Sequence, residues 1–244
     1  MIELRDLSKT YGTTRAVDRI SLKVPKGELF GFIGPNGAGK TTTIRMIGGL
    51  LAPSHGTVVI DGIDMAANPV EAKRRIGLIP DRPFLYEKLT GMEFMRFTAD
   101  LYDVAEERFH TRTEELLTLF GLLGRAHELI ESYSHGMKQR LIMAASLLHE
   151  PPILIVDEPM VGLDPRGIRM VRELFGDLAA NGTTIFMSTH TLKLAEDVCH
   201  QIGIINHGTL VATGTIDDLK LASGVAEADL EGAFLQLTRE GTDP

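Results

Sequence analysis

Glycine, lysine and threonine residues recur at a defined spacing between residues 34 and 41. The segment reads Gly34-Pro35-Asn36-Gly37-Ala38-Gly39-Lys40-Thr41: a glycine, four variable residues, a glycine, a lysine and a threonine. Because glycines lack a Cβ, such a backbone can curl into a nest of N–H donors that attracts anions. In loops of this pattern the lysine reaches the β- and γ-phosphates of a nucleoside triphosphate, and the hydroxyl ligates Mg²⁺. The spacing predicts such a site here, with Thr42 as the next contributing residue.

The sequence around this loop supplies the elements that would position it. The apolar run Leu29-Phe30-Gly31-Phe32-Ile33 precedes the loop, and the helix-forming run Thr42-Thr43-Ile44-Arg45-Met46-Ile47 follows it. A helix that starts at the loop directs the positive end of its dipole at a bound phosphate. The alternative is a glycine-rich turn that matches by accident, and the strand–loop–helix context disfavours it.

Two carboxylates end a second apolar run, Leu154-Ile155-Val156-Asp157-Glu158. In parallel sheets, ligands bind at the carboxyl ends of the strands. Asp157 would hold Mg²⁺ through its water shell, and Glu158 would orient or polarise the attacking water. A solvated acidic strand end is the simpler alternative, but the joint pattern with a phosphate loop favours nucleotide hydrolysis.

Composition limits the class of protein. The chain has 244 residues, a formal net charge of −8, 43% hydrophobic and 24% charged residues, and one cysteine. These values are typical of a globular protein in a reducing compartment, and the acidic charge argues against a general nucleic-acid binder. The longest apolar runs are too short to span a bilayer, and the N-terminus lacks a signal-peptide pattern. We therefore expect a cytoplasmic protein that reaches any membrane through a partner.

The order of the apolar patterns predicts the fold class. Alternating residues before residue 25 indicate antiparallel strands, whereas short apolar strands alternate with helices in the rest of the core. A helical period runs from about residue 90 to 150, and a last helix is expected at about 225–240. The prediction is one α/β domain over residues 1–244: a P-loop NTPase core with a mainly parallel sheet, an antiparallel β-lobe and an inserted α-helical subdomain.

With these motifs in place, the chain resembles the nucleotide-binding subunit of an ATP-binding cassette (ABC) transporter. The family signature, usually Leu-Ser-Gly-Gly-Gln, is matched by Tyr133-Ser134-His135-Gly136-Met137, where His135 and Met137 depart from the pattern. The resemblance implies that Ser134 and Gly136 contact the γ-phosphate of ATP held by an opposite subunit, and so implies a head-to-tail dimer. In isolation, a serine at a helix start is also an ordinary N-cap.

Three further segments fit the resemblance. Gly162-Leu163-Asp164-Pro165 is similar to the family's D-loop, although Asp164 would also cap a helix that starts at Pro165. His190 ends an apolar strand and matches the switch histidine, which is implied to contact the γ-phosphate and the catalytic water. Tyr11 corresponds to the aromatic residue that stacks on adenine. The implied catalytic residues are therefore Glu158, His190 and Lys40.

Asp81 is the largest departure, because the family usually has a glutamine there that touches Mg²⁺ or water. It would be either a further acidic group at the metal, with Thr41 and Asp157, or a turn former after Pro80. The aromatic loop that follows, Arg82-Pro83-Phe84-Leu85-Tyr86, lies where the family docks the permease. The alternative for these aromatic residues is a buried satellite core.

The resemblance implies an ATP-binding and ATP-hydrolysing subunit that uses Mg²⁺ and powers a separate integral-membrane permease. It covers nearly the whole chain, and the tail, Tyr133 and Met137 are most similar to ABC-2-type systems, many of them exporters. The expected place is the inner face of the cell membrane, with no nucleic-acid partner. The alternative is a soluble ABC ATPase that acts on nucleic acid or ribosomes. Such proteins typically carry a long coiled-coil insertion or two cassettes, and this sequence contains neither.

Overall fold

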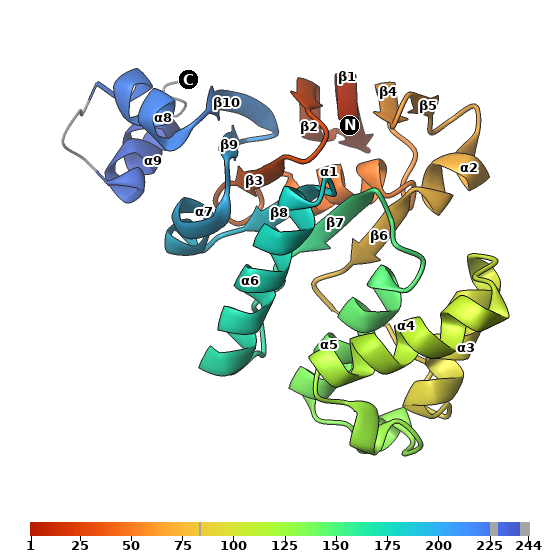
Figure 1. Ribbon diagram of the computed structural model, residues 1–244. Helices are drawn as coiled ribbons and strands as arrows, with labels where there is room; N and C mark the ends of the chain where they lie inside the picture. Colours follow the sequence, from red (N-terminus) through yellow and green to blue (C-terminus); the bar gives the residue numbers. More distant parts are fainter. Residues whose placement is uncertain (83, 225–228, 240–244) are drawn as a thin grey trace.

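The computed structural model describes residues 1–82, 84–224 and 229–239, and its centre is a six-stranded sheet (Figure 1). The strand order is β10-β9-β3-β8-β7-β6, and the pairs from β9 to β6 are parallel. The strands are β3 (Leu29–Ile33), β6 (Ile76–Ile79), β7 (Ile153–Asp157), β8 (Thr184–Thr189), β9 (Gln201–Asn206) and β10 (Thr209–Gly214). The predicted mainly parallel sheet is confirmed.

Both faces of this sheet are buried, and alternate side chains enter two different cores. In β3, Phe30 and Phe32 pack with the β-lobe, whereas Leu29 and Ile33 pack with the helical part of the chain. This division follows from the two-residue period of a strand. The continuous apolar runs seen in the sequence are those of strands covered on both sides.

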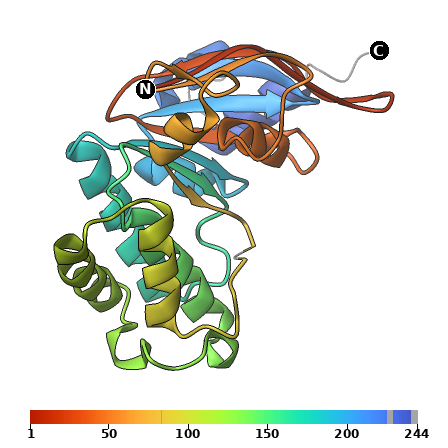
Figure 2. The ribbon, with the colours of Figure 1, turned by 90° about the vertical axis from the view of Figure 1, so that its right-hand side faces the viewer.

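The β-lobe is a second, antiparallel sheet with the order β2-β1-β4-β5. Its strands are β1 (Ile2–Tyr11), β2 (Thr14–Val24), β4 (His55–Ile60) and β5 (Ile63–Asp64). Exposed and buried residues alternate along much of β1 and β2, as the sequence predicted for strands with one solvated face. Figure 2 shows this lobe lying over one face of the central sheet.

Three helices and two short 3₁₀ turns are inserted between β6 and β7, and Figure 2 shows them on the far side of the sheet from the lobe. The helices are α3 (Gly91–Leu101), α4 (Glu106–Leu119) and α5 (His135–Leu147), and the 3₁₀ turns are η1 (Leu123–Arg125) and η2 (Ile130–Ser132). Thr90 starts α3 with a capping box, in which its hydroxyl accepts from the N–H of Glu93 at 3.1 Å.

The remaining helices are α1 (Lys40–Ile47), α2 (Pro69–Arg74), α6 (Pro165–Ala180), α7 (Leu192–Val198), α8 (Ile216–Ala222) and α9 (Leu230–Arg239). The helix after the glycine loop starts at Lys40, two residues earlier than the apolar run indicated. Pro83 of the aromatic loop, residues 225–228 before the last helix, and the tail 240–244 lie outside the described residues. Within the described part of the chain, no helix is long and apolar enough to cross a membrane.

Candidate nucleotide-binding site

The carboxyl ends of three neighbouring parallel strands meet at one cleft. The register pairs Ile33 of β3 with Thr189 of β8, and Ser188 of β8 with Asp157 of β7. The cleft has a volume of about 370 Å³. It is lined by Ala16, Asn36, Gly37, Gly39, Lys40, Thr41, Thr42, Asp81, Asp157, Glu158, Val161 and His190. Residues far apart in the sequence are therefore brought to one edge of the sheet, as the strand pattern requires.

Two glycines of the loop lie too close to the backbone of other elements to carry a side chain. Gly39 has φ 110°, and a Cβ there would lie 2.5 Å from the carbonyl oxygen of Ala16. A Cβ on Gly34 would lie 2.3 Å from the carbonyl oxygen of Ile205. Both distances are shorter than a carbon–oxygen contact allows, so the loop can pass between β2 and β9 only with glycine at these positions.

The ammonium of Lys40 is held inside the loop. Its Nζ donates to the carbonyl oxygens of Gly34 at 2.7 Å and Pro35 at 3.1 Å, and the side chain is buried. Burial lowers the pKa of Lys40, and the nearby charges of Glu158 and Asp157 partly oppose that shift. A charged phosphate oxygen is a stronger acceptor than a neutral carbonyl. The lysine can therefore exchange these partners for phosphate oxygens.

Asp157 is buried at the end of β7, where the hydroxyl of Ser188 donates to its Oδ1. This bond fixes one carboxylate oxygen and leaves the other available. Glu158 follows in an unusual backbone conformation, with φ 50°. A positive φ in a residue other than glycine is uncommon and occurs often at active sites.

Glu158 and His190 are in direct polar contact in the cleft. The carboxylate Oε1 of Glu158 accepts from Nδ1 of His190 at 2.7 Å, and its Oε2 accepts from the hydroxyl of Thr189 at 3.3 Å. The side chain of Glu158 is 15% exposed and that of His190 is 59% exposed. Because the carboxylate accepts at Nδ1, the neutral imidazole has its free acceptor at Nε2. This arrangement can orient a water molecule and take a proton from it.

The donor set of the cleft fits Mg²⁺. This ion prefers oxygen ligands and is bound through one or two carboxylates together with substrate phosphates. The hydroxyl of Thr41 and the carboxylates of Asp157 and Asp81 line the same cleft. In the described residues, no group of three or more His, Cys, Asp or Glu side chains is placed to hold a metal by itself. The cleft therefore suits an ion shared with phosphate oxygens.

Gly34, Pro35 and Ala38 of the phosphate loop do not line the cleft, and three further predicted residues lie away from it. Ser134 and Gly136 are at the start of α5, where the Ser134 hydroxyl accepts from the N–H of Met137 at 3.3 Å and caps the helix. Tyr11 ends β1, is 47% exposed, and has Nζ of Lys9 5.5 Å from its ring centre. None of these three lines the cleft of its own chain, and their roles stay predictions.

Sequence reasoning missed two residues that line the cleft, Ala16 and Val161. Ala16 lies on β2, which packs against the loop only because the β-lobe folds over the sheet. Neither side chain is chemically distinctive, so a single sequence carries no signal for them. In the sequence, Ser188 and Thr189 only precede His190, and nothing indicates a role for them. In the structure, their hydroxyls donate to the carboxylates of Asp157 and Glu158.

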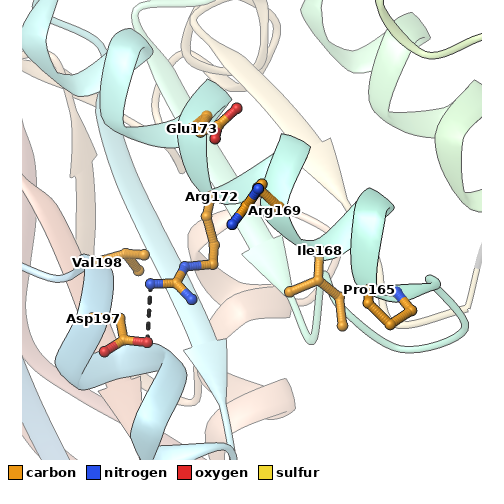
Figure 3. Close-up of a pocket in the computed structure, with 7 residues that line it drawn as sticks. All are labelled: Pro165, Ile168, Arg169, Arg172, Glu173, Asp197 and Val198. Carbon is orange, nitrogen blue, oxygen red and sulfur yellow. Dashed lines mark ion pairs between the residues drawn. The ribbon is translucent and has the colours of Figure 1, made fainter.

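A second hollow, of about 470 Å³, lies between α6 and α7 (Figure 3). It is lined by Pro165, Ile168, Arg169, Arg172, Glu173, Asp197 and Val198. Arg172 and Asp197 form an ion pair across it at 2.9 Å. Its two arginines are matched by two carboxylates, and it contains none of the predicted site residues.

Comparison with known proteins decides the family. Residues 17–161, more than half of the chain, match the family described as ABC transporter. The chain belongs to the ABC transporter family. It is 38% identical over 219 residues to the linearmycin resistance ATP-binding protein LnrL of Bacillus subtilis, covering 90% of this chain and 70% of that protein. It is 41% identical over 221 residues to the bacitracin transport ATP-binding protein BcrA of Bacillus licheniformis, covering 90% and 71%.

Solved structures agree with the fold. The structure of an ATP-binding subunit of an ABC transporter superposes with a TM-score of 0.93 at 37% identity, covering 98% of this chain and 99% of that one. A dimeric post-hydrolysis state of the cassette MJ0796, bound to ADP and Pi, has a TM-score of 0.79 at 25% identity, covering 88% and 98%. The P-loop NTPase fold and the ABC ATPase assignment are therefore confirmed. As a member of this family, the chain is an ATP-binding and ATP-hydrolysing transporter subunit.

Proposed function

We propose that this chain binds Mg·ATP in the cleft, closes with a second copy head to tail, and uses ATP hydrolysis to drive a separate membrane permease. The observation that carries the proposal is the meeting of the phosphate loop, Asp157, Glu158 and His190 in one cleft, with Glu158 and His190 in contact at 2.7 Å. The proposed dimer and ATP hydrolysis agree with the dimeric, ADP- and Pi-bound state of the similar cassette MJ0796.

The chemistry follows from the placement of charges. The loop N–H groups, the start of α1 and the ammonium of Lys40 offset the charge of a triphosphate. Thr41, Asp157 and Asp81 would hold Mg²⁺, which neutralises the charge that develops on the phosphate oxygens. Glu158 orients a water for in-line attack and accepts its proton, and His190 keeps the carboxylate in place through Nδ1.

Asp81 fits the metal role better than the turn role. Its side chain lines the cleft together with Thr41 and Asp157. A turn-forming aspartate accepts from the backbone N–H two residues later, and residue 83 is a proline, which has no N–H to donate. We therefore assign Asp81 to the Mg²⁺ environment rather than to the bend after Pro80.

The second copy supplies the other wall of the site. Ser134 is exposed at the start of α5, a helix of 13 residues whose first N–H groups can bind an anion. Neither Ser134 nor Gly136 reaches the cleft of its own chain. A head-to-tail dimer would give both residues a γ-phosphate to bind. Tyr11, exposed at the end of β1, would stack on the adenine ring.

The permease would dock on an exposed group of aromatic side chains, which we term the aromatic surface: Phe84, Tyr86 and Phe97. Phe84 is 78% exposed and Tyr86 is 49% exposed, so they do not form a buried satellite core. Exposed apolar groups of this kind mark protein interfaces. Docking there would bring the chain to the inner face of the membrane. Because one relative is named for linearmycin resistance and the other for bacitracin transport, we propose export as the direction.

The test is the variant Glu158→Gln in the purified chain. The amide keeps the size of the side chain but cannot accept a proton, so we expect steady-state ATP turnover to fall at least a hundredfold. ATP binding should persist, and size-exclusion chromatography with Mg·ATP should show a stabilised dimer. The control is Glu173→Gln, an exposed carboxylate on α6 outside the cleft, which should keep wild-type turnover. Full turnover in Glu158→Gln would remove Glu158 from its role.

A further inference from the structure

The first turn of α5 lies directly on the loop that joins β7 to α6. Gly162 in that loop has φ 80°, and a Cβ on it would lie 2.2 Å from Cδ2 and 2.7 Å from Nε2 of His135. The imidazole of His135 therefore covers the face of Gly162 from which a side chain would project. His135 stands where the family usually has a glycine, so this contact belongs to the residues of this chain.

Two further contacts fix the same junction. A Cβ on Gly136 would lie 3.0 Å from the carbonyl oxygen of Gly162, so the two backbones are close. Nη2 of Arg140 donates to Oδ1 of Asp164 at 3.3 Å. The same Oδ1 accepts from the N–H of Gly167 at 2.9 Å and caps α6. The loop is therefore held against α5 at Gly162 and again at Asp164.

The loop that joins β7 to α6 is short and begins at Glu158, whose carboxylate lies in the cleft. Three residues separate Gly162 from Glu158, and the N–H of Val161 donates to the carbonyl oxygen of Glu158 at 3.3 Å. A second tight turn follows, in which the N–H of Leu163 donates to the carbonyl oxygen of Met160 at 3.2 Å. Glu158 itself has a positive φ, which persists only when its surroundings hold it. A shift at Gly162 would therefore be transmitted to Glu158.

We infer that His135 is a positioning residue for ATP hydrolysis: its ring, packed on Gly162, sets the conformation of residues 159–164 and through them the placement of Glu158. The inference rests on the proposed role of Glu158. It also ties Ser134, which would serve the partner's ATP, to the carboxylate that serves this chain's own ATP. His135 acts by shape here and needs no proton transfer.

The experiment is a double-mutant cycle with Gly162→Ala and His135→Ala in the full chain. In Gly162→Ala the new methyl collides with the ring, so we expect kcat for ATP to fall at least tenfold, with KM within twofold of wild type. Every atom in that clash belongs to the imidazole, so adding His135→Ala should raise the kcat of Gly162→Ala at least threefold, to the level of His135→Ala alone. The single variant His135→Ala should lose about threefold in kcat, because the loop loses its support.

The matched control is Gly121→Ala. Gly121 also has a positive φ, 66°, but a Cβ there has no neighbour within 4 Å, so it tests backbone strain without the clash and should keep wild-type kcat. Circular dichroism and ATP binding check that each variant is folded. A rescue of less than threefold, or a change in KM instead of kcat, would overturn the positioning role. Inactive wild-type protein, or active Glu158→Gln, would instead overturn the proposed function.

Discussion

His149 is a buried histidine outside the cleft, at the end of the helical insertion. Its ring stacks on Tyr102 with ring centres 3.7 Å apart, and its Nε2–H donates to the carbonyl oxygen of Ile76 at 3.1 Å. Its Nδ1 is buried and has no partner among the described residues. Burial lowers the pKa of His149 from 6.5 to about 4, and the bond to Ile76 opposes that shift. The folded protein therefore holds this imidazole neutral.

The lowered pKa of His149 predicts a loss of stability in mild acid. Between pH 6.5 and 4 the unfolded chain binds a proton that the folded chain does not, so stability is full above pH 6.5 and falls as the pH drops toward 4. At 1.36 kcal/mol per pKa unit, the loss in unfolding free energy reaches about 3 kcal/mol. Urea melts at pH 7, 6, 5 and 4 measure it.

His149→Phe keeps a ring on Tyr102 and removes the titration, so its unfolding free energy should depend less on pH than that of wild type over this range. The exposed His127→Asn serves as the control and should keep the wild-type dependence. Equal pH dependence in wild type and His149→Phe would contradict the assignment.

At the residue scale, the sequence predicted what short motifs encode. Lys40, Thr41, Asp157 and Glu158 were assigned from local spacing, and the structure brings them to one cleft. The contact of His135 with Gly162 could not be predicted, because it joins residues of two separate elements. His135 departs from the family signature, and the structure shows its ring lying on Gly162.

At the element scale, loops and helix N-termini position the functional side chains, and the strands of the central sheet hold these loops next to one another. The apolar runs predicted β3 and β7 within two residues, because fully buried parallel strands carry an uninterrupted apolar signal. The short α2 and α8 were not predicted. Helices of six or seven residues show less than two turns of periodicity. The capping box of Thr215 and Asp218 was the one local signal for α8.

The aromatic surface joins a loop to a helix. Tyr86 packs edge-on against Phe97 of α3, with ring centres 5.3 Å apart, and Phe84 packs against Tyr86 at 5.9 Å. The exposed rings of the loop are therefore packed against a ring of α3.

Replacing Phe84 and Tyr86 by serine should separate turnover from transport. We expect basal ATP turnover to stay within twofold of wild type, because neither ring lines the cleft. Co-purification with an integral-membrane partner, and the turnover that this partner stimulates, should both fall at least tenfold. The control is Leu221→Ser, which alters an exposed apolar residue on α8. Unchanged association would place the permease elsewhere, and ribosomes or DNA in place of a membrane protein would favour a soluble ABC ATPase.

At the scale of the whole molecule, one central sheet separates two cores and carries the cleft at its edge. The β-lobe packs over one face of the sheet, and the helical insertion, whose α5 is capped by Ser134, lies on the other side (Figures 1 and 2). The chain thus holds one wall of an ATP site and, outside that cleft, a candidate for the other wall. Strand periodicity predicted this architecture. The head-to-tail dimer was inferred from the family resemblance. A single chain could not supply this inference, because the contacts between two copies are absent from it.

The most direct test of an ATP site that is shared between two copies mixes two inactive variants, Glu158→Gln and Ser134→Glu, before Mg·ATP is added. The glutamate places a negative charge where the partner's γ-phosphate would bind, so each variant alone should turn over ATP at less than one hundredth of the wild-type rate. Ser132→Glu, two residues upstream on the exposed 3₁₀ turn, is the control for the added charge and should stay active.

In a mixed head-to-tail dimer, one site combines the intact Glu158 of one chain with the intact Ser134 of the other. Half the dimers in an equal mixture are mixed, and each has one working site of two. The account therefore predicts recovery of about a quarter of wild-type turnover. A mixture as inactive as its two components would contradict it, because a site built within one chain gains nothing from a partner.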